Sequence, residues 1–404
     1  MENYILLIMT IALAGAVSDC AAEHNLTLQH QLYRFFFALI YTLFLIRYYY
    51  GPDIATYVPH FEQTGSPLYL IRHPDEMAFE PGYEILCSSV KVLGASYWGL
   101  TAITTTLYFL AIACLLKRLE RHRLFALVCI VLFDYNLIYA QSRQCLAVTF
   151  FIFMVLCLQD KKYVLALLMG GLTLSFHKSG IIPICTTLVG IPLWNMRHNA
   201  GFYKLLLVLL VVLLLVPVSR VSASLLSALP LSESYVKSIH HHVILGKQLQ
   251  LIGIIYIALL MLIIHLHRPR AKYYYGWIVI ESLMGLALIV AFYQYYYLLM
   301  RIRSFFIPAI TVYVISMVNH ETQNRQIPYS TLARQIMVSL LIFYFTHSAI
   351  RYNQMVKSWH SPVARACTVF DLRNASSKQI RDRQMNIAKM YWTKDYRSGD
   401  QNKL

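Results

Sequence analysis

The sequence predicts an all-α fold, a polytopic bundle of about 11 to 12 transmembrane helices. Hydrophobic residues make up 58% of the 404 residues and charged residues only 13%, whereas soluble domains carry roughly 25% charged residues. The apolar residues also form long runs, such as 205–216 and 249–265, and a spanning helix needs about 20 mostly apolar residues. Because such runs recur along the whole chain, its length does not divide it into soluble domains.

The sequence predicts one membrane domain, residues 1–350, followed by a basic C-terminal tail, residues 351–404. The tail holds eleven Lys or Arg side chains and four Asp side chains. It has no apolar face long enough for a domain, so we expect a peripheral helix near 377–392. The apolar segment 4–17 has no basic flank and no clear cleavage site, so we interpret it as the first span, not a signal peptide.

Short basic loops set the expected orientation, because Lys and Arg favour cytosolic loops. These loops are 117–123, 160–162, 195–204 and 267–272. The expected spans are 3–20, 33–47, 97–116, 124–141, 145–159, 163–176, 180–194, 202–217, 249–266, 273–293, 304–319 and 334–350, with a short helix at 82–95. The outer side then receives the segments 47–84, 141–144, 177–179, 219–248 and 293–303. This count places the tail outside against its charge, so either the tail follows the charge rule weakly or the count is wrong by one span near 81–96.

The formal net charge is +16. We expect the basic residues to lie in cytosolic loops near anionic lipid headgroups, and not to bind nucleic acid. The eight cysteines include no C-x-x-C pair, and we expect neither a disulfide nor a metal site. His240–His242 are adjacent, so their side chains diverge and do not suggest a metal site. No cofactor is expected.

Acidic candidates follow the second span. Gly51 and Pro52 break a helix there. Asp53 can then cap the next helix, or its carboxylate can lie at the mouth of a cavity. Glu80 precedes a proline that suits the first turn of a helix, and Glu84 projects from the same face four residues later. Both carboxylates also suit the helix macrodipole.

Basic candidates lie at two outer hairpins. Arg143, followed by Gln144, stands between two apolar spans with almost no loop. A charge near the membrane is costly and usually faces a cavity with a partner, although snorkelling to headgroups is the alternative. His177 and Lys178 at the next hairpin can hold a phosphate or move a proton, or they are ordinary interfacial residues.

Further charged residues fall in or beside later spans. Arg301 and Arg303 are two residues apart, so at most one faces a cavity. The neighbouring tyrosines form an interfacial belt or stack on sugar rings: Tyr293, Tyr295, Tyr296 and Tyr297. Asp134 and Glu281 lie within spans, where an ionisable residue is a functional candidate by default.

Four short motifs occur in order: Arg47 with Gly51-Pro-Asp53 and Tyr57; Glu80-x-Gly-Tyr-Glu84; Arg143-Gln-x-Leu-Ala147; and Phe176-His177-Lys-Ser179. Together they resemble the EpsG family, which is grouped with Wzy-type polysaccharide polymerases of bacterial envelopes. The resemblance covers about residues 1–350 and does not include the basic tail. The family usually has a small or apolar residue where this chain has Lys178.

The resemblance implies a GT-C-like membrane glycosyltransferase, independent of metal, that makes O-antigen, capsule or exopolysaccharide. It would act on the outer face of the bacterial inner membrane and transfer a glycan from polyprenyl (undecaprenyl) diphosphate to the next lipid-linked acceptor. Expected partners are this lipid-linked oligosaccharide, membrane lipid, a chain-length regulator and a flippase. The predicted catalytic residues are Asp53, Glu80, Arg143 and His177. The predicted substrate-binding residues are Arg47, Tyr57, Glu84, Gln144, Lys178, Tyr235, Arg301 and Arg303.

Elementary chemistry agrees with that reaction. A diphosphate leaving group needs cations, and arginine suits bidentate phosphate contacts. The acceptor hydroxyl needs a base or an orienting carboxylate, for which Asp53, Glu80 and His177 are the candidates. The alternatives are a flippase or transporter of lipid-linked oligosaccharide, which should show repeated halves, a membrane O-acyltransferase with its site on the cytosolic side, and an assembly partner binding through the tail.

Overall fold

The computed structural model describes residues 4–22, 25–48, 53–193, 276–291, 296–323 and 367–368. These residues are helical except for turns and one antiparallel pair of two-residue strands, β1 (Arg47–Tyr48) and β2 (Cys367–Thr368). The predicted all-α class is therefore confirmed. The expected spans 202–217, 249–266 and 334–350, the domain boundary at residue 350 and the tail helix lie outside the described residues.

Four of the described helices are long and apolar enough to cross a membrane: Tyr97–Leu116, Arg123–Ala140, Ser142–Gln159 and Leu299–Ser316. The described residues also include four shorter apolar helices. The chain is thus a helical membrane protein, as its composition predicts. The chain also divides into two units: one holds Met1–Thr149, Ser175–Lys178 and Arg325–Leu404, and the other holds Phe150–Leu174 and Ser179–Asn324.

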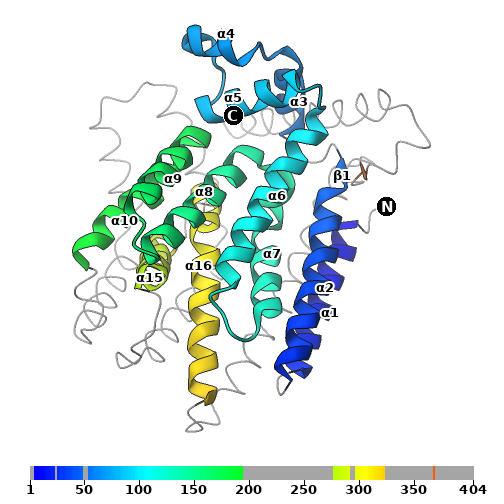
Figure 1. Cartoon of the computed structure of the whole chain (residues 1–404), viewed down its shortest axis with the longest axis vertical. Coiled ribbons are helices and arrows are strands. Elements are labelled where there is room, and N and C mark those ends of the chain that lie inside the picture. Colours follow the sequence, from blue (N-terminus) through cyan, green and yellow to red (C-terminus); the bar gives the residue numbers. More distant parts are fainter. Residues whose placement is uncertain are drawn as a thin grey trace, which may run out of the picture. The chain divides into compact units, whose positions relative to one another are not determined.

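The first unit contains a group of long helices (Figure 1): α1 (Tyr4–Ala21), α2 (Leu26–Leu45), α6 (Tyr97–Leu116) and α7 (Arg123–Ala140). Phe109 of α6 lies near the centre of their packing, with ring contacts to Phe37 and Phe44 of α2. The start of α2 was predicted at residue 33 and lies earlier. The reason is a cap, because the Asn25 side chain accepts a hydrogen bond from the Leu28 N–H at 2.9 Å.

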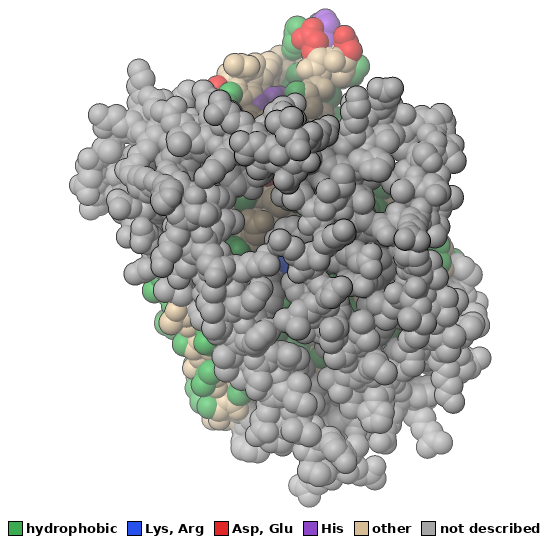
Figure 2. Space-filling model, turned by 180° about the vertical axis from the view of Figure 1, so that it is seen from behind, with side chains coloured by type: hydrophobic (Ala, Val, Ile, Leu, Met, Phe, Trp, Pro, Cys, Tyr) green, Lys and Arg blue, Asp and Glu red, His purple; other side chains and the backbone are tan. Residues whose placement is uncertain are grey.

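Four short helical segments, including one 3₁₀ turn, lie between β1 and α6: α3 (Ile54–Gln63), α4 (Pro67–Arg72), η1 (Pro74–Glu76) and α5 (Pro81–Val92). They lie beyond the end of α6 at which that helix begins (Figure 1). Figure 2 shows acidic and histidine side chains at this end, where His73, Asp75 and Glu76 are exposed. The predicted helix 82–95 corresponds to α5. A helix after Asp53 was foreseen without an assigned end, and it is α3, whereas α4 was not predicted. The segment therefore forms a structured cover, with Ser66 capping α4 through the Tyr69 N–H.

Helices α8 (Ser142–Gln159) and α9 (Tyr163–Phe176) run from one unit into the other. The second unit also holds α10 (Ile181–Leu193), α15 (Gly276–Ala291) and α16 (Tyr296–Gln323). Helices α15 and α16 pack very closely at Gly285, where an added Cβ would lie only 2.3 Å from Phe306. The close approach of small residues is typical of helix packing in membranes.

Candidate active site

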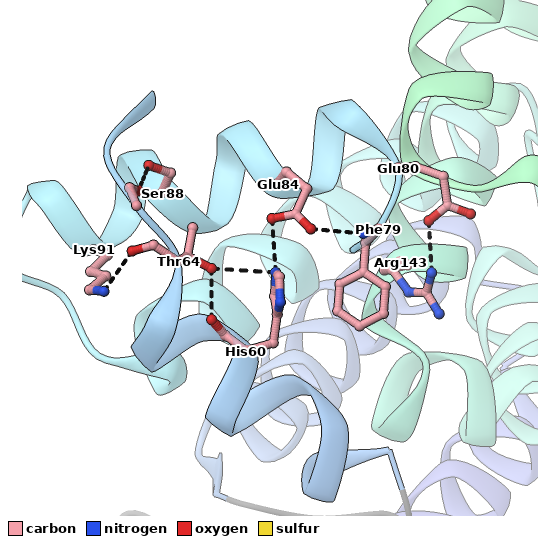
Figure 3. Close-up of polar contacts among 9 residues, drawn as sticks. His60, Thr64, Phe79, Glu80, Glu84, Ser88, Lys91 and Arg143 are labelled. Atoms are coloured by element: carbon pink, nitrogen blue, oxygen red, sulfur yellow. Dashed lines mark hydrogen bonds and ion pairs between the residues drawn. The ribbon is translucent and has the colours of Figure 1, made fainter. Parts of the chain in front are cut away.

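Three segments of the first unit meet around one ion pair. The Arg143 Nη1 atom donates to Glu80 Oε2 at 2.7 Å (Figure 3). Its Nε atom donates to the Tyr57 hydroxyl at 3.2 Å. The Arg143 side chain is 22% exposed and that of Glu80 is 6% exposed. The pair is therefore mostly withdrawn from water while one part of the guanidinium remains accessible.

The local sequence explains why Arg143 is at this place. Only Gln141 separates α7 from α8, and Arg143 is the second residue of α8. The hairpin between these two apolar helices is thus as short as predicted. Long side chains at a helix start project back toward its N-terminal end, so the guanidinium extends beyond the apolar helices toward α3 and α5.

Glu80 joins this hairpin to the next one. It precedes Pro81, the first residue of α5, and its Oε1 atom accepts a hydrogen bond from the Lys178 backbone N–H at 3.1 Å. The two segments approach closely because residue 82 is glycine. A Cβ at Gly82 would lie 2.5 Å from Ser175 Oγ and 2.8 Å from the Ser175 carbonyl oxygen.

Aromatic rings fix the plane of the guanidinium. The Arg143 Cζ atom lies 4.2 Å from the centre of the Phe79 ring and 5.5 Å from that of Tyr57. Arginine is well suited to such stacking because its guanidinium is planar and delocalised. Arg143 is therefore held by hydrogen bonds from Nη1 and Nε and by the adjacent Phe79 and Tyr57 rings.

A second pair, between a histidine and a carboxylate, lies one helical turn further along α5. His60 Nε2 lies 2.8 Å from Glu84 Oε2, and Glu84 Oε1 accepts the Phe79 N–H at 2.8 Å. The Phe79 ring meets the His60 ring edge-on at 4.5 Å (Figure 3). Glu80 and Glu84 thus face the same side of α5, as their spacing predicts, and Phe79 contacts the partner of each.

These contacts set the protonation of the acidic groups. Burial alone would raise the pKa of Glu80, but the Arg143 charge and the Lys178 N–H outweigh it and hold the pKa below its ordinary value. Burial also raises the pKa of Glu84, but the hydrogen bonds from His60 and the Phe79 N–H lower it by more, so the pKa lies below its ordinary value. Burial and the nearby Asp53 charge raise the pKa of Tyr57 to about 12. The site at neutral pH therefore contains two ionised carboxylates and a neutral phenol.

A family model of the EpsG family matches residues 31–357. The chain belongs to the EpsG family. The match includes all four motifs from Arg47 to Ser179, so the resemblance seen in the sequence is confirmed. Membership indicates a membrane polysaccharide polymerase. No curated protein and no solved structure matches the chain.

The other motif residues of this EpsG-family chain differ in burial and contacts. Asp53 directly precedes α3, but its backbone is helical and its side chain does not cap that helix, so the capping interpretation was wrong. Arg47 is buried, donating to the Phe44 carbonyl oxygen at 2.8 Å and to the Thr105 hydroxyl. Gln144 is buried beside Arg143, His177 is half-buried, and the Lys178 side chain is exposed.

The arginines of α16 belong to the second unit. Arg301 is exposed and Arg303 is buried, so residues two apart on this helix do face different surroundings. Asp134 lies at a kink in α7, where its φ of −111° and ψ of 15° depart from helical values. Glu281 is buried and accepts hydrogen bonds from Thr186 and Thr187 of α10. Tyr235, Tyr293, Tyr295 and His240–His242 lie outside the described residues, as do the side chains of Tyr296 and Tyr297.

Two residues of the site, His60 and Phe79, were not predicted. A signal for His60 was present, because it follows Tyr57 by three residues and shares its face of α3, just as Glu84, four residues after Glu80, shares its face of α5. This signal was missed because the helix that follows Asp53 was given no extent and its residues no faces. Phe79 carries no comparable sequence signal, since a single aromatic residue before a helix is common.

Proposed function

We propose that this protein polymerises lipid-linked oligosaccharide repeat units in the bacterial inner membrane. It transfers a glycan from polyprenyl diphosphate to the next lipid-linked acceptor, in the synthesis of O-antigen, capsule or exopolysaccharide. The observation that carries the proposal is the position of Arg143. It lies at the tip of a membrane hairpin, hydrogen-bonded to Glu80 and packed against the Phe79 ring, in a chain of the EpsG family. A positioned arginine at that depth suits a membrane-bound anion.

The leaving group explains the requirement for arginine. As the bond between the sugar carbon and the diphosphate oxygen breaks, negative charge grows on the diphosphate. Fixed donors placed where this charge develops lower the barrier. Two of the five guanidinium N–H groups are committed to Tyr57 and Glu80 among the described residues, so the diphosphate would bind at the remaining accessible edge.

Lys178 supplies a second cation to the proposed site. Its backbone N–H is fixed by Glu80 while its side chain remains exposed. A flexible ammonium can follow the diphosphate as it leaves, whereas the planar guanidinium positions it. The lysine that departs from the family pattern therefore has a consistent place in the proposed site.

The side of the membrane follows from the basic loops. In the first unit, residues 117–122 lie at the opposite end of α6 and α7 from Arg143 (Figure 1). If this basic loop is cytosolic, the site faces the periplasm or the outside. That orientation suits a donor that has already been linked to lipid and moved across the membrane.

Deleting the gene tests the function and separates the alternatives. A polymerase deletion leaves single repeat units on surface lipid, and the wild-type gene restores long polymer. A flippase deletion would leave no repeat units outside the membrane, and an acyltransferase deletion would leave polymer that lacks acyl groups. Either of those two results would contradict the proposed function.

A further inference from the structure

The His60–Glu84 pair is a histidine–carboxylate dyad beside the diphosphate-binding pair. The two pairs share neighbouring elements, because α3 supplies Tyr57 and His60, while Glu80 directly precedes α5 and Glu84 lies in its first turn. The Phe79 ring separates Arg143 on one side from His60 on the other, as Figure 3 shows. A cationic group and an imidazole therefore lie on opposite sides of a single ring.

The hydrogen bonds define the tautomer of His60. Glu84 is ionised and can only accept hydrogen bonds, and one of its oxygens is already taken by the Phe79 N–H. The contact at 2.8 Å therefore requires the hydrogen on Nε2 of His60. In the neutral ring this leaves a lone pair on Nδ1, and the carboxylate stabilises the imidazolium that forms when Nδ1 takes a proton.

The dyad is accessible on one side only. The His60 side chain is 17% exposed, whereas that of Glu84 is 1% exposed. The imidazole is therefore the more accessible member of the dyad, and the carboxylate is buried behind it. This division of roles is that of a base and the group that orients it.

The frame that holds the dyad is well fixed. The Lys91 Nζ atom of α5 donates to the carbonyl oxygens of Glu62 and Thr64, both at 2.7 Å, at the C-terminal end of α3. The Thr64 hydroxyl donates to the His60 carbonyl oxygen at 2.7 Å. These bonds fasten α3 to α5 over the turn that carries His60, so the imidazole is positioned before any substrate binds.

We propose that His60, oriented by Glu84, is the general base that activates the acceptor hydroxyl. This inference rests on the proposed polymerase function and deepens it. Nδ1 takes the proton of the acceptor hydroxyl as its oxygen bonds to the sugar carbon of the donor. The bond from that carbon to the diphosphate oxygen breaks, and the polyprenyl diphosphate leaves with the electron pair. Solvent then removes the proton from His60.

The test uses full-length protein in vesicles with its lipid-linked repeat unit as both donor and acceptor. Wild-type transfer is measured first, and its absence would contradict the proposed function and the dyad with it. His60→Ala should then reduce the transfer rate by about 10²- to 10⁴-fold, the range expected for a lost general base. Added imidazole should restore part of the rate, because it can occupy the space that the side chain leaves.

Two further variants separate chemistry from structure. His60→Gln can still donate to Glu84 but has no basic nitrogen, so it should lose activity as His60→Ala does while its abundance stays normal. His73→Ala changes an exposed histidine that stacks on Tyr69 in the same segment, and it should leave the rate unchanged. The dyad is wrong if His60→Gln transfers within about threefold of wild type, or if imidazole fails to raise the rate of His60→Ala.

Discussion

At the scale of single residues, the site depends on how one arginine is held. Arg143 donates to a carboxylate and a phenol, and the Phe79 ring lies 4.2 Å from its Cζ atom. A lysine could satisfy the carboxylate by charge alone. It could not reproduce the planar set of donors or the stacking, so the geometry favours a role in which the direction of the N–H groups matters.

Arg143→Lys separates these roles. The charge is kept, so a purely structural ion pair should survive, whereas a diphosphate clamp should lose about 3 kcal/mol of transition-state stabilisation, or roughly 100-fold in rate. Arg123→Lys is the matched control, because Arg123 also begins an apolar helix and donates to the Leu119 carbonyl oxygen at the opposite end. Polymer length on gels, with protein level checked by blot, gives the readout. A wild-type ladder from Arg143→Lys would exclude the clamp.

The lowered pKa of Glu80 gives a pH dependence of stability. A carboxyl group whose pKa is depressed by folding contributes stability fully above its ordinary pKa of 4.5. That contribution is lost as the pH falls through the depressed value. Glu84 behaves in the same direction. The thermal midpoint of the detergent-solubilised protein should therefore fall on acidification below about pH 4.5.

Glu80→Gln tests the assignment of that pH dependence, because it removes one titrating group and keeps the shape. Its midpoint should be lower than wild type at neutral pH and should fall less on acidification. Parallel curves for the two proteins would show that the Arg143–Glu80 pair does not contribute to the stability.

At the scale of elements, the sequence allowed the long helices to be predicted well, because each is marked by a long apolar run ended by polar residues. α6, α7, α8 and α9 begin within three residues of the predicted positions and end within one. The site was predicted in part: Glu80, Arg143 and the backbone at Lys178 do meet. The extent of α3 was not assigned, because its ten residues are too short and too polar for the hydropathy pattern that marks a span. His60 was therefore not assigned to a helix face.

The contact between α5 and residues 175–178 depends on Gly82. Gly82→Ala would place a methyl group against the backbone of Ser175, so the start of α5 must move and the Glu80 to Lys178 hydrogen bond should lengthen. Overpacking of this kind costs about 1–3 kcal/mol, and we expect a lower thermal midpoint together with a loss of transfer. Gly171→Ala is the control, because nothing lies within 4 Å of a Cβ at that position. Equal behaviour of the two variants would contradict the close packing.

At the scale of the whole molecule, the orientation in the membrane decides which substrate the site can meet. Glu120 and Asp75 are both exposed carboxylates, the first in the basic loop after α6 and the second in the segment before α5. Cysteine at residue 75 should react with a membrane-impermeant thiol reagent in intact cells, and cysteine at residue 120 should react only after the membrane is opened. The unsubstituted protein measures the background from its eight cysteines. The reverse pattern would place the site on the cytosolic side.

The most direct test is transfer by the purified protein alone. Wild-type protein in vesicles is given the lipid-linked repeat unit, and both the saccharide ladder and the released polyprenyl diphosphate are measured. We predict a ladder in which each new linkage releases one polyprenyl diphosphate, with no nucleotide added. Folded protein that binds the lipid-linked unit yet forms no linkage and releases no diphosphate would contradict the proposed polymerase.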